Sequence, residues 1–201
     1  PGAEARGERH LVNRYFDTPS LALAHAKAAL RLRYVARDGH AGQWLQTLKS
    51  VGEARDGLHV RHEWELSVKG EALELAALIA ACDVPQTVEL LRSEGANVVA
   101  QFETNFVRRL WRYIAGDGTA VEIAFDQGEV AVAIDGTRHT EPLVEVELEL
   151  LDAPDDDREG QGERILHALA ADLRAALPEL RSDNVSKAQR GYRLRQKILG
   201  H

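Results

Sequence analysis

The segment Glu145-Val146-Glu147-Leu148-Glu149-Leu150 alternates carboxylates with aliphatic side chains over six consecutive residues. Successive side chains of a β-strand point to opposite faces, so this period of two predicts a strand with a row of glutamates about 7 Å apart. Like charges in such a row repel one another. We therefore expect them to be neutralised by solvent, by basic side chains across the sheet, or by divalent metal ions.

The composition is that of a globular protein. The 201 residues contain 44% hydrophobic and 28% charged side chains, enough for one domain over residues 1–201 with a sizeable core. No apolar run reaches the ~20 residues of a membrane helix and no signal-peptide pattern is present, so we expect a cytoplasmic protein without membrane contact. The net charge of −7 argues against a nucleic-acid partner. Cys82, the only cysteine, excludes an intramolecular disulfide and a multi-cysteine zinc site.

The same two-residue alternation recurs along the chain and predicts an antiparallel sheet, with helices confined to the connections and the C-terminal end. The strand patterns cover residues 30–34, 44–49, 60–68, 98–114, 119–125, 129–134 and 140–151. The helical patterns cover residues 21–28, 72–82, 85–92, 165–177 and 186–199. Glycine-bearing turns are expected at 39–42, 116–118, 127–128 and 135–137. The fold class is therefore α+β, either an open domain or a helix-decorated barrel.

The polar faces of these strands are rich in ionisable groups of both signs. If the sheet closes with its apolar faces outward, helices can cover those faces, and the charged faces line a tunnel for which about eight strands suffice. A polyphosphate carrying divalent cations is a ligand that satisfies both signs. The alternative is an open sheet whose charged face is turned to solvent, and periodicity alone does not distinguish the two.

Eight short segments carry a further signal when they are taken in chain order. They are residues 15–19 (YFDTP), 29–33 (ALRLR), 44–49 (WLQTLK), 61–65 (RHEWE), 108–111 (RRLW), 121–128 (VEIAFDQG), 145–150 (EVELEL) and 186–192 (SKAQRGY). In this order they resemble the CYTH family, also called triphosphate tunnel metalloenzymes, and among its members the bacterial inorganic triphosphatases.

The resemblance implies a closed eight-stranded antiparallel β-barrel with helices packed outside, which hydrolyses or rearranges triphosphates with Mg²⁺ or Mn²⁺. It implies catalytic roles for Glu122 and Lys49. The basic residues it assigns to the phosphate chain are Arg31, Arg33, Lys49, Arg61, Arg108, Lys187 and Arg190. The acidic residues it assigns to metal are Glu63, Glu65, Asp126, Glu145, Glu147 and Glu149. Arg190 could instead cap the final helix, and Asp126 could be a turn residue before Gly128.

The sequence departs from the family pattern at its N-terminal end. The family opens on a Glu-x-Glu-x-Lys strand that binds metal, and no such motif lies between Pro1 and Arg14. Glu4 and Glu8 have neither the spacing nor, by their neighbours, a strand context. We therefore expect the first strand and helix of the domain to be missing from this sequence.

The leading functional hypothesis is metal-dependent hydrolysis of inorganic triphosphate to diphosphate and phosphate. The alternatives are a class IV adenylyl cyclase or a thiamine triphosphatase with the same fold, or a polyphosphate- or nucleotide-binding module without turnover. No segment identifies a pocket for adenine or thiamine. The expected partner is a small-molecule triphosphate, and a homodimer is left open.

Overall fold

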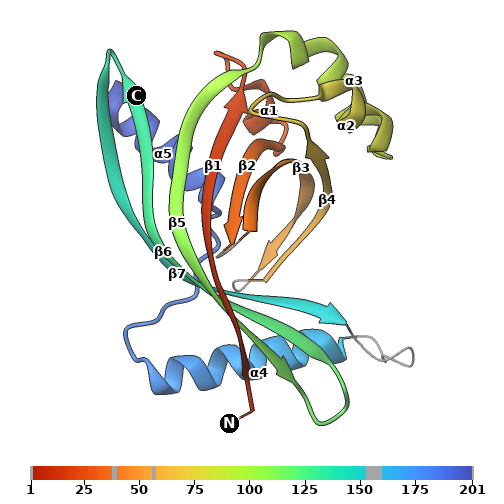
Figure 1. Cartoon of the computed structure of the whole chain (residues 1–201), viewed down its shortest axis with the longest axis vertical. Coiled ribbons are helices and arrows are strands. Elements are labelled where there is room, and N and C mark those ends of the chain that lie inside the picture. Colours follow the sequence, from red (N-terminus) through yellow and green to blue (C-terminus); the bar gives the residue numbers. More distant parts are fainter. Residues whose placement is uncertain (1, 38–39, 56–57, 153–159, 201) are drawn as a thin grey trace.

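One antiparallel sheet organises the protein in the computed structural model (Figure 1). The structure describes residues 2–37, 40–55, 58–152 and 160–200, and their side chains except at 37, 40, 41, 51–55, 58–61 and 152. Within these residues the sheet has seven strands in the order β4-β3-β2-β1-β5-β6-β7. The strands are β1 (Glu4–Asp17), β2 (Ala29–Arg37), β3 (His40–Arg55), β4 (Leu58–Val68), β5 (Val99–Ile114), β6 (Ala120–Ile134) and β7 (Thr137–Asp152).

The helices lie in the connections and at the C-terminal end, as predicted. They are α1 (Ala22–His25), α2 (Leu75–Ala81), α3 (Pro85–Glu94), the 3₁₀ turn Gly95–Asn97, α4 (Gln161–Ala176) and α5 (Lys187–Leu199). α4 ends just before Pro178, which cannot continue a helix. None of the described helices is both long and apolar enough to cross a membrane.

The closed eight-stranded barrel is not what the described residues form. Their sheet has seven strands, and β4 and β7 stand at its two edges. One reason for the difference is that the patterns at 119–125 and 129–134 belong to a single strand, β6. The predicted turn at Gln127-Gly128 was therefore wrong.

Gly128 marks a close approach of two strands rather than a turn. A Cβ atom at this position would lie 2.5 Å from the Cα of Phe106 on β5 and would also overlap the Asn105 carbonyl oxygen. The chain reverses instead at Asp135-Gly136, where positive φ angles of 50° and 75° form the two-residue hairpin turn between β6 and β7.

The N-terminal segment is a second correction. Glu4 and Glu8 do lie in a strand, because residues 4–17 form β1 in the middle of the sheet between β2 and β5. Burial alternates along β1 only from Leu11 onward. The first part of the strand is polar on both faces, so no period of two could reveal it.

The sheet curls so that its charged face turns inward. Lys49 on β3 lies near enough for its charge to act on Glu147 and Glu149 on β7, although four strands separate β3 from β7 in the sheet order. In a flat sheet the two strands would lie about 24 Å apart, a distance at which charges are screened. We call the face that carries these residues the inner face.

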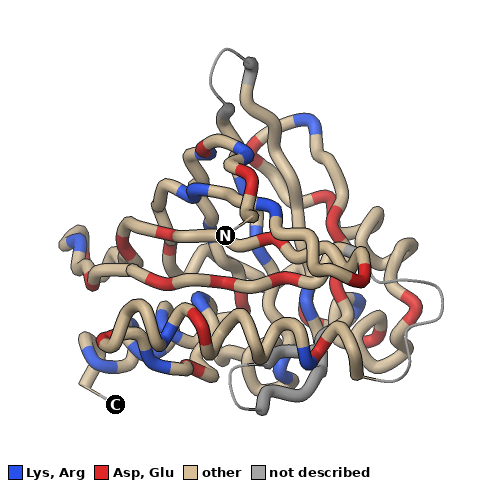
Figure 2. Tube along the Cα trace, turned by 90° about the horizontal axis from the view of Figure 1, so that it is seen from below, with Lys and Arg blue, Asp and Glu red and all other residues tan. Residues whose placement is uncertain are grey.

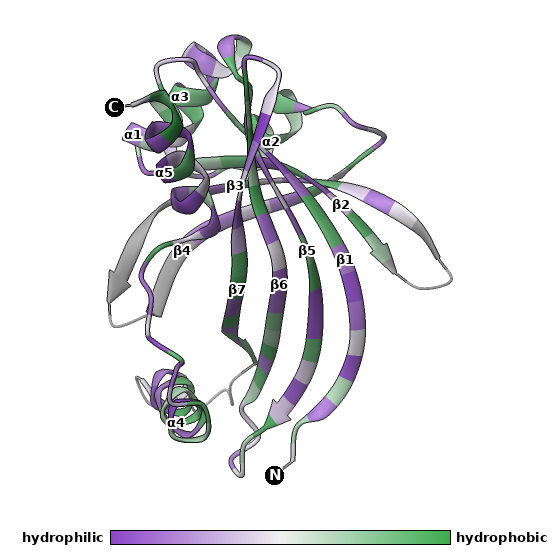
Figure 3. Ribbon diagram, turned by 90° about the vertical axis from the view of Figure 1, so that its left-hand side faces the viewer, coloured by the Kyte–Doolittle hydropathy of each residue, from purple (hydrophilic) through white to green (hydrophobic). Residues whose placement is uncertain are grey.

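The opposite face is apolar and covered by helices, as the sequence predicted. Leu30, Leu48 and Trp64 pack there against residues of α2 and α3, and the buried Cys82 belongs to the same cluster. α4 packs against β7 at the other end of the sheet, far from α1, α2 and α3 (Figures 1 and 3). Hydrophilic and hydrophobic bands alternate along the strands in Figure 3, which is the pattern that the sequence shows.

The inner face is not charged along its whole length. At one end, Leu11, Tyr15, Phe102 and Phe106 form an apolar cluster, and α5 packs on this cluster through Leu194 and other residues. No pattern in the sequence predicted that a helix would cover part of the inner face. The open part of that face is therefore bounded at one end by α5.

The close approach at Gly128 generates a test of the strand pairing. Gly128→Ala should lower the free energy of unfolding by about 2 kcal/mol or more, because the backbone atoms of β5 must move to admit a methyl group. Gly116→Ala is the control, since a Cβ atom there has nothing within 4 Å and the change should cost less than about 0.5 kcal/mol. Equal urea midpoints for the two variants would contradict this pairing.

Candidate functional site

The strand register brings the predicted site residues together on the inner face. Arg31 lies opposite Thr47, which lies opposite Glu65. Further along the sheet, Arg108 pairs in register with Asp126, and Asp126 with Glu145. Residues directly opposite one another share a face, so each row joins basic and acidic side chains across neighbouring strands. Figure 2 shows both signs of charge spread along the strands.

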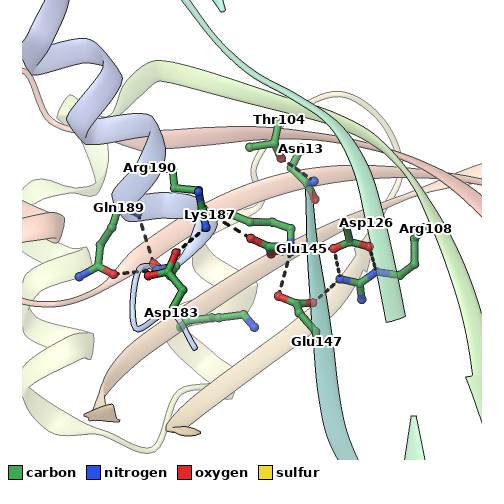
Figure 4. A network of polar contacts seen from close by, with 12 residues as sticks. Asn13, Thr104, Arg108, Asp126, Glu145, Glu147, Asp183, Lys187, Gln189 and Arg190 are labelled. Atoms are coloured by element: carbon green, nitrogen blue, oxygen red, sulfur yellow. Dashed lines mark hydrogen bonds and ion pairs between the residues drawn. The ribbon is translucent and has the colours of Figure 1, made fainter. Parts of the chain in front are cut away.

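Three carboxylates on β6 and β7 form the centre of the site, and we call Asp126, Glu145 and Glu147 the acidic triad. One oxygen from each lies within 4.8 Å of the others. The Lys187 Nζ lies 2.8 Å from Asp126 and 2.8 Å from Glu147, and it also pairs with Glu145. Arg108 donates two hydrogen bonds of 2.7 Å to Asp126 and pairs with Glu147 as well (Figure 4). Lys187 therefore touches all three carboxylates, and Arg108 touches two of them.

Asp126 is a strand residue with no exposed surface, so its reading as a turn residue was wrong. Its two oxygens accept from Arg108 and one of them also lies beside Lys187. A buried carboxylate without such partners would be strongly destabilising. The pairing with two cations explains how this charge is tolerated in the sheet.

The pKa shifts in this cluster follow from burial and from the opposite charges. Burial disfavours the Lys187 ammonium, but Glu147, Glu145 and Asp126 outweigh it and raise the pKa of Lys187. Burial likewise disfavours the Glu147 carboxylate, but Lys187 and Arg108 hold its pKa well below the usual range. Burial and the neighbouring Glu147 raise the pKa of Glu145 despite Lys187. The Lys187–Glu147 pair thus stays ionised at neutral pH.

A second cluster lies on β2, β3 and β4. The Arg31 Nη2 lies 3.4 Å from Glu63 and 3.5 Å from Glu65, and the Lys49 Nζ lies 2.7 Å from Glu63. The Thr47 hydroxyl accepts from Arg31 at 3.1 Å and donates to Glu65 at 2.9 Å. Glu63 and Glu65, which the family resemblance assigned to metal, are therefore paired with the basic side chains of neighbouring strands.

Arg33 differs from the other cations of the inner face. Its Nε donates to the Asn13 side-chain oxygen at 2.6 Å, and the Asn13 amide donates in turn to Thr104 at 2.9 Å. Among the described residues, no carboxylate lies within ion-pair distance of it. Burial, with Arg31 adding repulsion, lowers the pKa of Arg33 to about 9. A buried cation held only by an amide is a place where an anionic ligand would supply the missing charge.

Asn13 and Thr104 were not predicted as site residues. Both are buried on the inner face, and Asn13 lies in β1, whose N-terminal half has no strand pattern. Thr104 and Thr47 share the period of two with charged neighbours on their strands. A threonine on the same side of a strand as charged residues is therefore the sequence signal that could have identified them.

Glu122 and Glu149 face each other on β6 and β7, on the same side as the acidic triad. Burial, together with the charges of Glu122 and Glu63, raises the pKa of Glu149. Burial and the neighbouring Arg31 lower the pKa of Lys49. The pKa values of Glu149 and Lys49 are therefore both shifted toward neutral pH.

The remaining predicted residues are Arg190 and Arg61. Arg190 lies 2.5 Å from Asp183 and 3.5 Å from Glu145, so it links the acidic triad to the segment before α5. It does not cap α5, because Ser186 and Gln189 form a capping box there. The Arg61 side chain lies outside the described residues.

Comparison with known proteins gives one family match over most of the chain. The family model of the CYTH domain matches residues 1–192. An inorganic triphosphatase of Haemophilus influenzae is 28% identical over 190 residues, which are 93% of this chain and 46% of that protein. The chain therefore spans about half the length of this curated relative.

Solved structures with a similar fold include the PH1819 protein of Pyrococcus horikoshii OT3. It has a TM-score of 0.57 and 18% identity, and the match covers 95% of this chain and 88% of that one. The HpAC1 protein of Hippeastrum, described as having a dominant triphosphatase activity, has a TM-score of 0.56 and 18% identity over 94% of this chain and 84% of its own. At this identity the two likenesses show the fold.

The lowered pKa of Glu147 generates a pH-dependent prediction. Its ion pairs add stability above the usual Glu pKa of about 4.3, and this stability is lost as the pH falls toward the lower folded-state pKa. Because 47% of the side chain is exposed, Glu147→Gln should cost about 1 kcal/mol at pH 7. The cost should be nearly constant from pH 7 to about pH 5, shrink as the pH falls further, and be largely gone by about pH 3.

Urea unfolding at several pH values would measure this difference. The control is Glu141→Gln, which removes an exposed acid of the same strand that pairs with Lys197 at 2.7 Å. A Glu147→Gln cost that does not decrease between about pH 5 and about pH 3 would contradict the proposed ion pairing.

Proposed function

The chain belongs to the CYTH family, and from this premise we propose that it is a metal-dependent triphosphatase that hydrolyses inorganic triphosphate to diphosphate and phosphate. The named activity of the Haemophilus influenzae relative supports the reaction class, although this chain spans about half of that protein. The observation that carries the proposal is the inner face itself. It combines the acidic triad with cations on both sides, among them Arg33 without a carboxylate partner.

The residues of this face fit a triphosphate. A linear triphosphate carries several negative charges on oxygens that accept hydrogen bonds from guanidinium and ammonium groups. Arg33 offers a positive charge that no described carboxylate neutralises, and Arg31, Lys49, Arg108 and Lys187 exchange carboxylates for phosphate oxygens. Arg190 and Arg61 complete the basic set that we assign to the substrate. Neutralisation of the phosphate oxygens by fixed cations lowers the barrier because the charges are already in place.

The acidic triad fits a divalent cation. Mg²⁺ and Mn²⁺ take hard oxygen ligands, and Asp126, Glu145 and Glu147 supply three such donors close together. Glu63, Glu65 and Glu149 are the further carboxylates that we assign to metal. A bound ion supplies charge neutralisation of phosphate oxygens and a lowered pKa for a coordinated water.

The remaining chemistry belongs to the side chains that move a proton. We assign removal of a proton from the attacking water to Glu122, which lies opposite Glu149 and shares its carboxylate environment. Lys49, with its pKa lowered by burial and by Arg31, holds the phosphate chain and lies close enough to Glu63 to exchange a proton. A cytoplasmic location, a homodimer and the lack of a nucleic-acid partner remain predictions.

A product assay with the full-length protein tests the proposed reaction. Incubation of tripolyphosphate with Mg²⁺ or Mn²⁺ should release one phosphate and one diphosphate, and the metal chelator EDTA should abolish the release. ATP and thiamine triphosphate should be cleaved more slowly, because no segment of the sequence identifies a pocket for a base. Cyclic AMP formed from ATP would contradict the proposal, and so would calorimetric binding of tripolyphosphate without hydrolysis.

The position of Lys187 generates a separate prediction about the metal. Its ammonium touches all three members of the acidic triad, so it must compete with a divalent cation for them. Lys187→Met should bind Mn²⁺ roughly tenfold more tightly than the wild type, as measured by electron paramagnetic resonance of free Mn²⁺.

Lys197→Met is the matched control, because it removes the same charge from α5 where the lysine is 71% exposed and pairs with Glu141. Circular dichroism would establish that both variants are folded. Equal Mn²⁺ affinities for the two variants would show that Lys187 does not compete with the metal.

A further inference from the structure

The buried carboxylate of Asp17 joins three distant parts of the chain. Its Oδ1 accepts from the backbone amides of Thr18 at 2.7 Å and Leu23 at 2.9 Å. Its Oδ2 accepts from the amide of Ala24 at 2.9 Å and from the hydroxyl of Tyr192 at 2.8 Å. Asp17 ends β1, the amides belong to α1 and its approach, and Tyr192 belongs to α5. One side chain with no exposed surface therefore ties α5 to the centre of the sheet.

The ring of Tyr192 fixes the same helix by packing. It meets the Phe102 ring edge-on at 4.9 Å between centroids, and Phe102 stacks on Tyr15 at 4.6 Å. The preceding residue, Gly191, lies so close to Phe102 that a Cβ atom would be 2.5 Å from the ring carbon Cγ. The ring contact sets how near α5 lies to β5, and the hydroxyl contact sets where the helix stands relative to Asp17.

The position of Lys187 depends on this anchor. Lys187 is the first residue of α5 and lies five residues before Tyr192, about 7.5 Å along the helix axis. The Ser186 and Gln189 capping box fixes where the helix begins. Because the helix between them is a rigid segment, a shift at Tyr192 carries the Lys187 ammonium away from the acidic triad.

We propose that Tyr192, held by Asp17, is a positioning residue that places the Lys187 ammonium in the site. Tyr192 has no contact with the acidic triad, so its influence on the site runs through α5. This inference rests on the proposed function only in its catalytic readout. A purely structural anchor would lower stability and leave the activity of each folded molecule unchanged, which separates the two roles.

Tyr192→Phe is the variant that tests the hydroxyl. It keeps the ring against Phe102, and Asp17 retains three backbone donors, so the fold should persist. We expect tripolyphosphate hydrolysis to fall about tenfold in kcat/KM, and the double variant with Lys187→Met to fall no further than Lys187→Met alone. Tyr113→Phe, on the other face of β5 from Arg108, is the control and should leave kcat/KM unchanged.

Losses that multiply in the double variant, or no loss in Tyr192→Phe, would overturn the proposal. Chemical labelling of lysines provides a readout that does not need activity. Mass spectrometry should show several-fold faster acetylation of Lys187 in Tyr192→Phe than in the wild type, with Lys197 as the internal reference.

Unchanged labelling of Lys187 would overturn the positioning role even if the protein hydrolyses triphosphate. If the wild-type protein does not hydrolyse tripolyphosphate, the proposed function is overturned. The labelling of Lys187 then decides by itself whether Tyr192 is a positioning residue. If Tyr192→Phe does not fold, Phe102→Leu tests the same anchor, because it loosens the ring contact and keeps the hydroxyl bond to Asp17. It should also speed the labelling of Lys187.

Discussion

The architecture of the site depends on the attraction between Lys187 and Arg108 and the three carboxylates of the acidic triad. Without these cations, Asp126 would be a buried charge and Glu145 and Glu147 would repel one another across neighbouring positions of β7. Arg108 comes from the sheet, whereas Lys187 comes from α5. The neutralisation of the sheet therefore requires a helix from the far end of the chain to dock on it.

That requirement explains why the inner face is divided. A helix can bring a lysine to the triad only if its own apolar side rests on something apolar. Tyr15, Phe102, Phe106 and Leu194 provide that surface at one end of the face. The charged region begins where the aromatic residues end, and Phe106 marks the border, since Lys187 lies 5.1 Å and Arg108 5.8 Å from its ring centroid.

Much of this could be predicted from the sequence because it depends on the alternation of side chains along a strand. The period of two placed Arg31, Lys49, Asp126 and Glu147 each on the charged side of its own strand, and the register shows that these sides form one face of the sheet. The period of two gave wrong or no predictions at positions where the local sequence is compatible with more than one structure. A glycine such as Gly128 is compatible with a turn and with a close approach of two strands. At the start of β1, polar and apolar side chains do not alternate, so no strand could be predicted there.

Pairing between charges could not be predicted in the same way, because it depends on which strands become neighbours. The family resemblance assigned Glu63 and Glu65 to metal and Arg31 and Lys49 to phosphate, yet these four residues lie together and neutralise one another. An ion pair of this kind can still bind ligands. When the carboxylate and the arginine separate, the carboxylate can bind a cation and the arginine can bind an anion. If the proposed function is correct, each ion pair of the inner face would open to bind a metal ion and a phosphate together. A metal–triphosphate complex carries both charges, so it can replace each partner of a pair without leaving a buried charge alone.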